Sequence, residues 1–144
     1  MFKRIVVVLG LCLAAQGLSA QTGLERVRKH LRETQAKRIL VGAANDPSAL
    51  GALRAFEEAG RADHCAVVGQ NGEPEARAEL RTRRSRFIGS VGFFPEKYGE
   101  GLIRLALDIL ARKALSPAVF IKHHLITPDN VDHFYPNDSL LGMA

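Results

Sequence analysis

The sequence predicts an α/β protein with a short parallel sheet flanked by helices. Three observations indicate this fold class. Short apolar runs alternate with helical periods, loops rich in turn-forming residues separate them, and 144 residues are enough for one domain. Because strands that alternate with helices are joined by helical crossovers, their pairing is expected to be parallel.

The first elements are a helix, a strand and a second helix. Leu24, Val27 and Leu31 recur at helical spacing among basic residues, which predicts an amphipathic helix. Residues 38–44 form an apolar run that is typical of a buried strand. The next helix is expected to have Asp46 as its N-cap, followed by Pro47 in the first helical position. Its apolar face carries Leu50, Leu53 and Phe56, and it ends at Gly60.

The second half of the chain continues the alternation. The sequence predicts strands at 64–68 and 87–94, with a short polar helix at 75–81 between them. A strongly periodic helix is expected from Pro95 onward, over residues 96–112, and a last strand begins at 119–121. The arginines between the polar helix and the third strand are interpreted as a solvated face, namely Arg81, Arg83, Arg84 and Arg86.

The N-terminal residues have the order of a secretory signal peptide. Met1–Arg4 is basic, residues 5–15 are apolar and uncharged, and small residues lead up to Ala20. We therefore expect residues 1–20 to be a signal peptide cleaved after Ala20, residues 21–144 to be the domain, and the location to be periplasmic. The alternative is that Arg4–Leu9 is a buried strand of a cytosolic α/β protein.

Composition argues against several classes of function. The net charge of +5 is small and aromatic residues are 6% of the chain, so a direct nucleic-acid partner is not expected. Two cysteines cannot build a disulfide scaffold or a four-ligand zinc site. The histidines and aspartates at 123–133 match no zinc spacing, and no nucleophile motif or dinucleotide fingerprint is present. The sequence predicts a protein that is not an enzyme and holds no metal or cofactor.

Polar and aromatic side chains follow three of the predicted strands. Because ligands of open parallel sheets bind beyond the carboxyl ends of the strands, these side chains are the candidate ligand-binding residues. Amides suit sugar hydroxyls because they both donate and accept hydrogen bonds, and aromatic faces cover the C–H side of a sugar ring. The alternative at each position is turn chemistry or core packing. The candidates are Asn45, Asp46, Gln70, Asn71, Phe93 and Phe94.

Three segments resemble the periplasmic sugar-binding proteins of ABC transporters, in the ribose-binding and LacI-type group. They are residues 44–56, residues 67–72 and residues 88–99. The resemblance runs from about Leu24 to Asn137 and covers only the second half of such proteins. It implies one partial lobe of a type I periplasmic-binding-protein fold, with Asn45 as a ligand of sugar hydroxyls. Asn71 stands where many relatives have Asp, and Phe93 where relatives often offer a polar contact.

The resemblance also implies what the protein does and what it contacts. The first expectation is a truncated carbohydrate-binding module with weak or no affinity, whose partners are a small sugar and an ABC permease. The alternative is a ligand-sensing core related to LacI-type regulators, without its DNA-binding domain. In the family, the stretch from Pro95 onward would pack in the other lobe. The apolar face of helix 96–112 is therefore expected to fold back onto the sheet, to pair in a homodimer, or to meet a complementary lobe.

Overall fold

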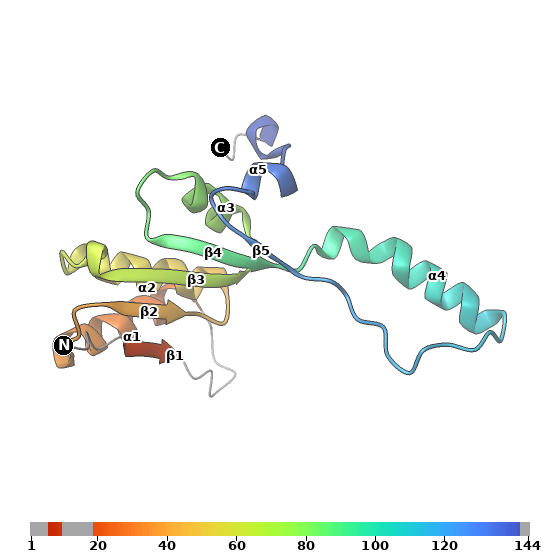
Figure 1. Ribbon diagram of the computed structural model, residues 1–144, viewed down its shortest axis with the longest axis horizontal. Helices are drawn as coiled ribbons and strands as arrows, with labels where there is room; N and C mark the ends of the chain where they lie inside the picture. The colour runs from red at the N-terminus through yellow and green to blue at the C-terminus, as the bar shows by residue number, and fades with distance from the viewer. Residues whose placement is uncertain (1–5, 10–18, 142–144) are drawn as a thin grey trace.

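A five-stranded sheet organises the protein. The computed structural model describes residues 6–9 and 19–141. The strand order is β1-β2-β3-β4-β5, with the first four strands parallel and the last antiparallel to β4 (Figure 1). The strands are β1 (Val6–Leu9), β2 (Ile39–Gly42), β3 (Cys65–Asn71), β4 (Phe87–Gly92) and β5 (His124–Ile126). The predicted fold class, an α/β lobe with a short parallel sheet, is confirmed.

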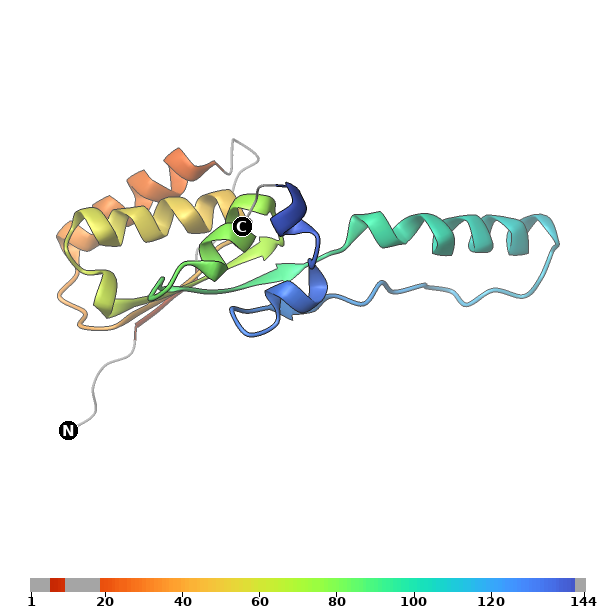
Figure 2. The same ribbon diagram turned by 90° about the horizontal axis from the view of Figure 1, so that it is seen from above.

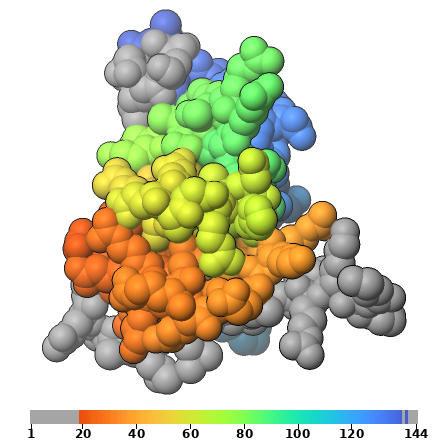
Figure 3. Space-filling view, turned by 90° about the vertical axis from the view of Figure 1, so that its left-hand side faces the viewer, coloured from red at the N-terminus to blue at the C-terminus, as the bar shows by residue number. Residues whose placement is uncertain are grey.

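Three helices cover one face of the sheet. They are α1 (Ala20–Glu33), α2 (Asp46–Glu58) and α3 (Pro74–Arg81), and they lie together on the same side of the strands (Figure 2). Seen from the end opposite α4, the segments of this part of the molecule lie next to one another in chain order, from orange through yellow to green (Figure 3). The helix α5 (Val131–Phe134) and the 3-10 turns η1 (Ala62–His64) and η3 (Asp138–Leu141) complete this part of the chain.

The core lies between these helices and the sheet. Phe56 of α2, Val67 of β3, Phe87 of β4 and Ile126 of β5 are all fully buried there. The helices α1 and α2 approach closely because Gly51 faces the carbonyl oxygen of Ala20, a space that a Cβ would fill. The predicted apolar faces of the first two helices therefore pack against the core, as their spacing predicted.

The opposite face of the sheet has no helix over it in the part of the chain that the structure describes. Within β2 to β5, strand alternation and register direct apolar side chains to this side, and we call five of them the open face. Leu40 and Leu125 are 38% and 53% exposed. The other three are half-buried. The open face consists of Leu40, Ala66, Val68, Val91 and Leu125.

Residues 98–123 leave the sheet as an arm. After the 3-10 turn η2 (Pro95–Lys97), the helix α4 (Tyr98–Leu110) extends away from the carboxyl ends of the strands, and residues 111–123 return beside it (Figures 1 and 2). No residue of α4 is buried, and residues 111–123 are all exposed. The expectation that this helix folds back onto its own sheet is wrong.

The last strand also differs from the prediction. It occupies His124–Ile126 and pairs antiparallel with β4, whereas the alternation predicted a parallel strand beginning at residues 119–121, which lie outside any strand. Val119, Phe120 and Ile121 have strand-forming side chains, but none of the strands that the structure describes pairs with them. β4 ends at Gly92, which pairs with His124, so the ladder to β4 begins at that residue.

At the N-terminus, residues 6–9 form β1 and pair in parallel with β2. This coincides with the strand of the alternative expectation over the residues that the structure describes there. Residues 1–5 and 10–18 lie outside the described residues, and cleavage after Ala20 stays a prediction. The described residues contain no helix long and apolar enough to cross a membrane.

Candidate functional site

The carboxyl ends of β2, β3 and β4 meet at one edge of the sheet. The Ala43 amide donates to the Val68 carbonyl oxygen at 2.9 Å, and Asn71 pairs with Gly92. The Gln70 side chain reaches the Ala43 carbonyl oxygen, with 3.5 Å between Nε2 and O. The sequence-predicted residues at the ends of these strands therefore lie along a common edge, as the parallel topology requires.

Asn45 is held by the start of α2. Its backbone is extended, and its Oδ1 accepts a hydrogen bond from the Ser48 amide at 3.0 Å, so Asn45 is the N-cap. The prediction that Asp46 caps this helix is wrong by one residue. The cap orients the half-buried Asn45 carboxamide at the edge of the sheet.

Asp46 turns inward and joins the loops of this edge. Ser90 Oγ donates to Asp46 Oδ1 at 2.6 Å, and the Glu73 amide donates to Oδ2 at 2.8 Å. Ser90 Oγ in turn accepts from the Gly72 amide at 3.0 Å. Desolvation raises the pKa of the Asp46 carboxyl, while the hydrogen bonds from Ser90 and Glu73 oppose that shift.

Through these hydrogen bonds, Asp46 holds the loop after β3 and the strand β4 in place at the carboxyl edge. Its side chain is fully buried, so it does not face a ligand as the sequence interpretation expected. Gly69 leaves the room for it, because a Cβ there would collide with Asp46 Oδ1. Removing the carboxylate would leave buried donors of Ser90 and Glu73 without an acceptor, at a cost of about 1–3 kcal/mol each.

Asn71 and Glu73 place polar atoms at the end of β3. Asn71 is in the left-handed region at φ 111°, which asparagine tolerates better than most residues. Its Nδ2 donates to Glu73 Oε1 at 2.8 Å. Sequence reasoning missed Glu73, whose half-buried carboxylate lies two residues beyond Asn71. The acidic residue directly before the helix-starting Pro74 is a signal that could have pointed to it.

The two phenylalanines that follow β4 have different environments. Phe93 is half-buried and lies against His123, with 4.6 Å between ring centroids. Phe94 is only 3% exposed and belongs to the core, where it stacks on Tyr135 at 5.6 Å with an interplanar angle of 13°. The interpretation of Phe94 as a ligand contact is therefore corrected, because its ring is enclosed by protein.

An ionic cluster that the sequence did not reveal locks the C-terminal segment to α3. The Arg77 guanidinium donates to both oxygens of Asp138, at 2.7 and 2.9 Å, and to the Gly72 carbonyl oxygen at 2.6 Å. Arg81 adds a contact of 3.0 Å to Asp138, and Arg77 lies 4.0 Å from the Tyr135 ring centroid. Arg77 and Asp138 are 61 positions apart, so no local pattern could have paired them. We call the cluster of Arg77, Arg81 and Asp138 the latch. Because Arg77 also binds the Gly72 carbonyl oxygen, the latch supports the loop that follows Asn71.

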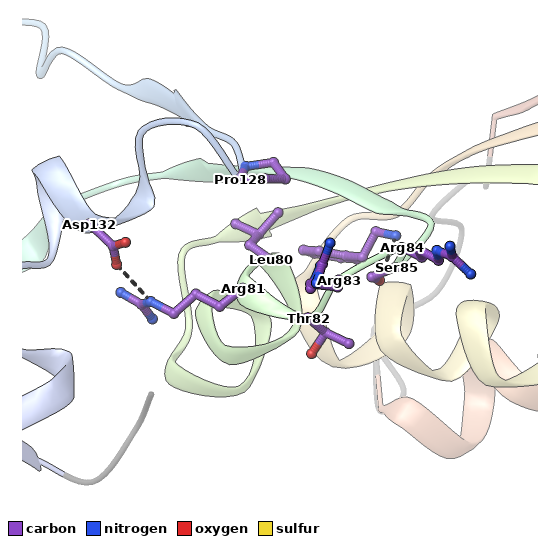
Figure 4. Close-up of a pocket in the computed structure, with 9 residues that line it drawn as sticks. Leu80, Arg81, Thr82, Arg83, Arg84, Ser85, Pro128 and Asp132 are labelled. Carbon is purple, nitrogen blue, oxygen red and sulfur yellow. Dashed lines mark hydrogen bonds and ion pairs between the residues drawn. The ribbon is translucent and has the colours of Figure 1, made fainter.

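A separate cavity of about 350 Å³ lies at the far end of α3, away from the carboxyl edge (Figure 4). Arg81 crosses its rim and donates to Asp132 Oδ1 at 2.8 Å. The predicted solvated arginine cluster is thus partly engaged: Arg81 pairs with Asp132 and Asp138, and Arg86 with Asp63. The cavity is lined by Leu80, Arg81, Thr82, Arg83, Arg84, Ser85, Phe87, Pro128 and Asp132. None of the residues predicted to bind ligand lines it.

The described part of the chain contains no group of three or more histidine, cysteine, aspartate or glutamate side chains that could hold a metal ion. The carboxyl edge offers hydrogen-bonding amides, one carboxylate and one aromatic ring. Amides can both donate and accept hydrogen bonds.

Comparison with solved structures identifies the fold. A solute-binding protein of an ABC transporter from Agrobacterium vitis with bound allitol matches with a TM-score of 0.73 at 21% identity, over 85% of this chain and 42% of that chain. A periplasmic solute-binding protein from Actinobacillus succinogenes with bound D-allose matches with a TM-score of 0.67 at 20% identity, over 81% of this chain and 40% of that chain. The lac repressor dimer bound to operator matches with a TM-score of 0.61 at 22% identity, over 76% of this chain and 32% of that chain.

The fold is that of one lobe of a type I periplasmic binding protein. The resemblance expected from the three sequence segments is confirmed at the level of fold, and the neighbours are binding and transport proteins together with a LacI-type repressor. This chain spans about two fifths of the length of the two solute-binding proteins. No protein-family model matches the sequence, and no match is found among the curated proteins.

Proposed function

We propose that the carboxyl edge is one wall of a carbohydrate-binding site, and that the chain binds a neutral sugar or polyol without catalysing a reaction. The observation that carries the proposal is the shared placement of Asn45, Gln70, Asn71 and Phe93 at one edge of the sheet. The fold adds support, because solved neighbours hold allitol and D-allose. Asp46 and the Arg77–Asp138 latch position this wall.

A single wall is expected to bind weakly. One lobe supplies about half the contacts of a closed two-lobe cleft and cannot exclude water from the ligand. The amide of Asn71 in place of a carboxylate also removes a charge-assisted acceptor. We therefore expect a Kd in the millimolar range, which corresponds to about 4 kcal/mol of binding free energy.

Calorimetric titration with allitol and D-allose tests the site. Asn45→Ser is the informative variant, because serine retains a capping oxygen for Ser48 while the carboxamide is lost. The proposal predicts at least a tenfold weaker Kd for Asn45→Ser, and an unchanged Kd for Asn137→Ser, an exposed asparagine outside the site. Equal affinity in Asn45→Ser and the parent chain would remove Asn45 from the site. Heat signals that are absent for every sugar and polyol would refute the binding proposal.

We further propose that the chain is exported and serves an ABC permease, with residues 1–20 removed as a signal peptide. Cleavage after Ala20 would also remove β1 and leave β2 as an edge strand. The second candidate is a ligand-sensing core of the LacI type, which the likeness to the lac repressor favours. N-terminal sequencing of material from the periplasmic fraction separates them: a start at Gln21 supports export, and an intact Met1 found only in the cytosol supports the sensing core.

A further inference from the structure

Within residues 6–9 and 19–141, two apolar surfaces lack a partner, and they differ in kind. The first is the open face of the sheet, which has no helical layer in the described residues. Sheets of parallel strands are normally covered on both faces. The second is the arm, whose helix α4 buries no residue. One surface is a sheet without a helix, and the other is a helix without a sheet.

The residue pattern of α4 fits a broad surface. At 100° per residue, its apolar side chains spread over roughly 200° of the helix circumference, wider than the seam of a two-helix coiled coil. They are Leu102, Ile103, Leu105, Ala106, Leu107, Ile109 and Leu110. The charged residues fill the remaining arc and pair within the arm, Arg104 with Glu100 at 3.0 Å and Lys113 with Asp108 at 2.6 Å. The charged side therefore needs no partner, whereas the apolar side does.

The exposed area is large enough for a stable interface. Nine large apolar residues between Leu102 and Ile121 are each 40% to 91% exposed. Taken together, they present an apolar surface on the order of 1,000 Å², comparable with the about 800 Å² that each partner buries in a standard interface. The largest apolar patch of a typical monomer is only about 300–600 Å².

The attachment of the arm directs it away from its own sheet. Phe94 is buried at its base with the Lys97 amine 4.6 Å from the ring centroid, and Phe93 contacts His123 where the arm returns. Both ends of the arm are thus held at the carboxyl edge, and the arm continues along the direction of the strands (Figures 1 and 2). No residue of α4 is therefore buried against the open face of its own chain.

We propose that two copies of this chain exchange arms, so that α4 of each copy packs on the open face of the other. A twofold axis that runs across the strands, between two carboxyl edges, lets each α4 cover the open face of the other copy. Such a symmetric pair is closed. The partner is a second copy because this one chain carries both halves of the missing helix-on-sheet contact. The arrangement is independent of whether the carboxyl edge binds carbohydrate.

Light scattering on the full chain after size exclusion tests the exchange. The parent chain should be a dimer at micromolar concentration. Leu110→Glu in the arm and Leu125→Glu on the open face should each raise the dissociation constant at least a hundredfold. Leu140→Glu is the matched control, because Leu140 is 82% exposed and lies outside both surfaces. It should leave the dimer unchanged, and circular dichroism should show all three variants folded.

Cross-linking identifies which surfaces meet. In a Cys12→Ser background, Leu40→Cys and Leu107→Cys chains are mixed and treated with a short bismaleimide. Cys65 is a poor competitor because it is buried, and burial raises the pKa of its thiol to about 11. The mixture should give a cross-linked heterodimer that neither variant gives alone.

Three results would overturn the exchange. A parent chain that is monomeric at 100 µM excludes it. A dimer that resists Leu125→Glu but not Leu110→Glu indicates arms paired with each other. A monomer that becomes a stable complex only with a separately expressed complementary lobe assigns the arm to that lobe.

Discussion

The helices on the sheet and the helix of the arm have equally regular apolar periodicity. Among the described residues, the helices on the sheet bury apolar side chains in a core, whereas α4 buries none. In α2, the apolar side chains of Leu53 and Phe56 are 4% and 0% exposed. In α4, a helix of the same 13-residue length, Leu102 and Leu110 are 59% and 79% exposed. Amphipathic periodicity therefore predicts that a helix forms and which side is apolar. It does not predict what that side will contact.

The largest expected effect is on the core of the sheet. Phe56→Ala should lower the free energy of unfolding by about 4 kcal/mol, because it removes a fully buried ring and leaves a cavity. Phe120→Ala, made in the monomeric Leu110→Glu background, removes a ring that is 91% exposed and should change the free energy by less than about 0.5 kcal/mol. Urea denaturation measures both. Equal losses would mean that the arm is part of the same cooperative core.

The next effect concerns the latch between α3 and the C-terminal segment. Asp138→Asn should lower the free energy of unfolding by about 3 kcal/mol, because it leaves the buried Arg77 guanidinium without its carboxylate. Asp132→Asn is the matched control, since its side chain is 82% exposed and its pair with Arg81 should contribute less than about 1 kcal/mol.

The pH dependence sharpens this test. Hydrogen bonds from Arg77, and then from Arg81, hold the pKa of Asp138 below its ordinary value. A lowered folded-state pKa contributes stability above the unfolded-state pKa of about 3.9, and the contribution is lost as the pH falls through the folded-state value. Asp138→Asn should therefore lose less stability than the parent between about pH 5 and pH 3. The raised pKa of Asp46 acts in the opposite direction in both proteins and cancels in the difference. Parallel pH profiles would contradict the ionic role of Asp138.

The smallest effect is confined to the arm. Gly101 lies inside α4 with open space around its Cβ position, so Gly101→Ala should stabilise that helix by about 1 kcal/mol. In the Leu110→Glu monomer, hydrogen exchange of α4 amides should slow about fivefold. The free energy of global unfolding should stay constant, because the arm is a separate unit. A matching rise in global stability would show that the arm and the sheet unfold together.

Sequence reasoning recovered the edge of the sheet but not its internal contacts. The apolar runs located β2, β3 and β4, and parallel topology placed Asn45, Gln70, Asn71 and Phe93 together. It misjudged Asp46 and Phe94, because burial of a side chain next to a strand end depends on segments that are distant in sequence. Ser90 completes the surroundings of Asp46 from 44 positions away, and Tyr135 covers the Phe94 ring.

The sequence by itself determined local preference: the helical periods, the turn-forming residues around Asn45 and Gly72, and the alternation that predicts parallel pairing, which holds for the first four strands. Only the tertiary structure decided which apolar faces are buried, that no helix of the described residues covers one face of the sheet, and that α4 extends from the carboxyl edge. The reason is that helix and strand formation depend on neighbours within a few residues, whereas burial depends on surfaces that come together from distant parts of the chain or from another molecule.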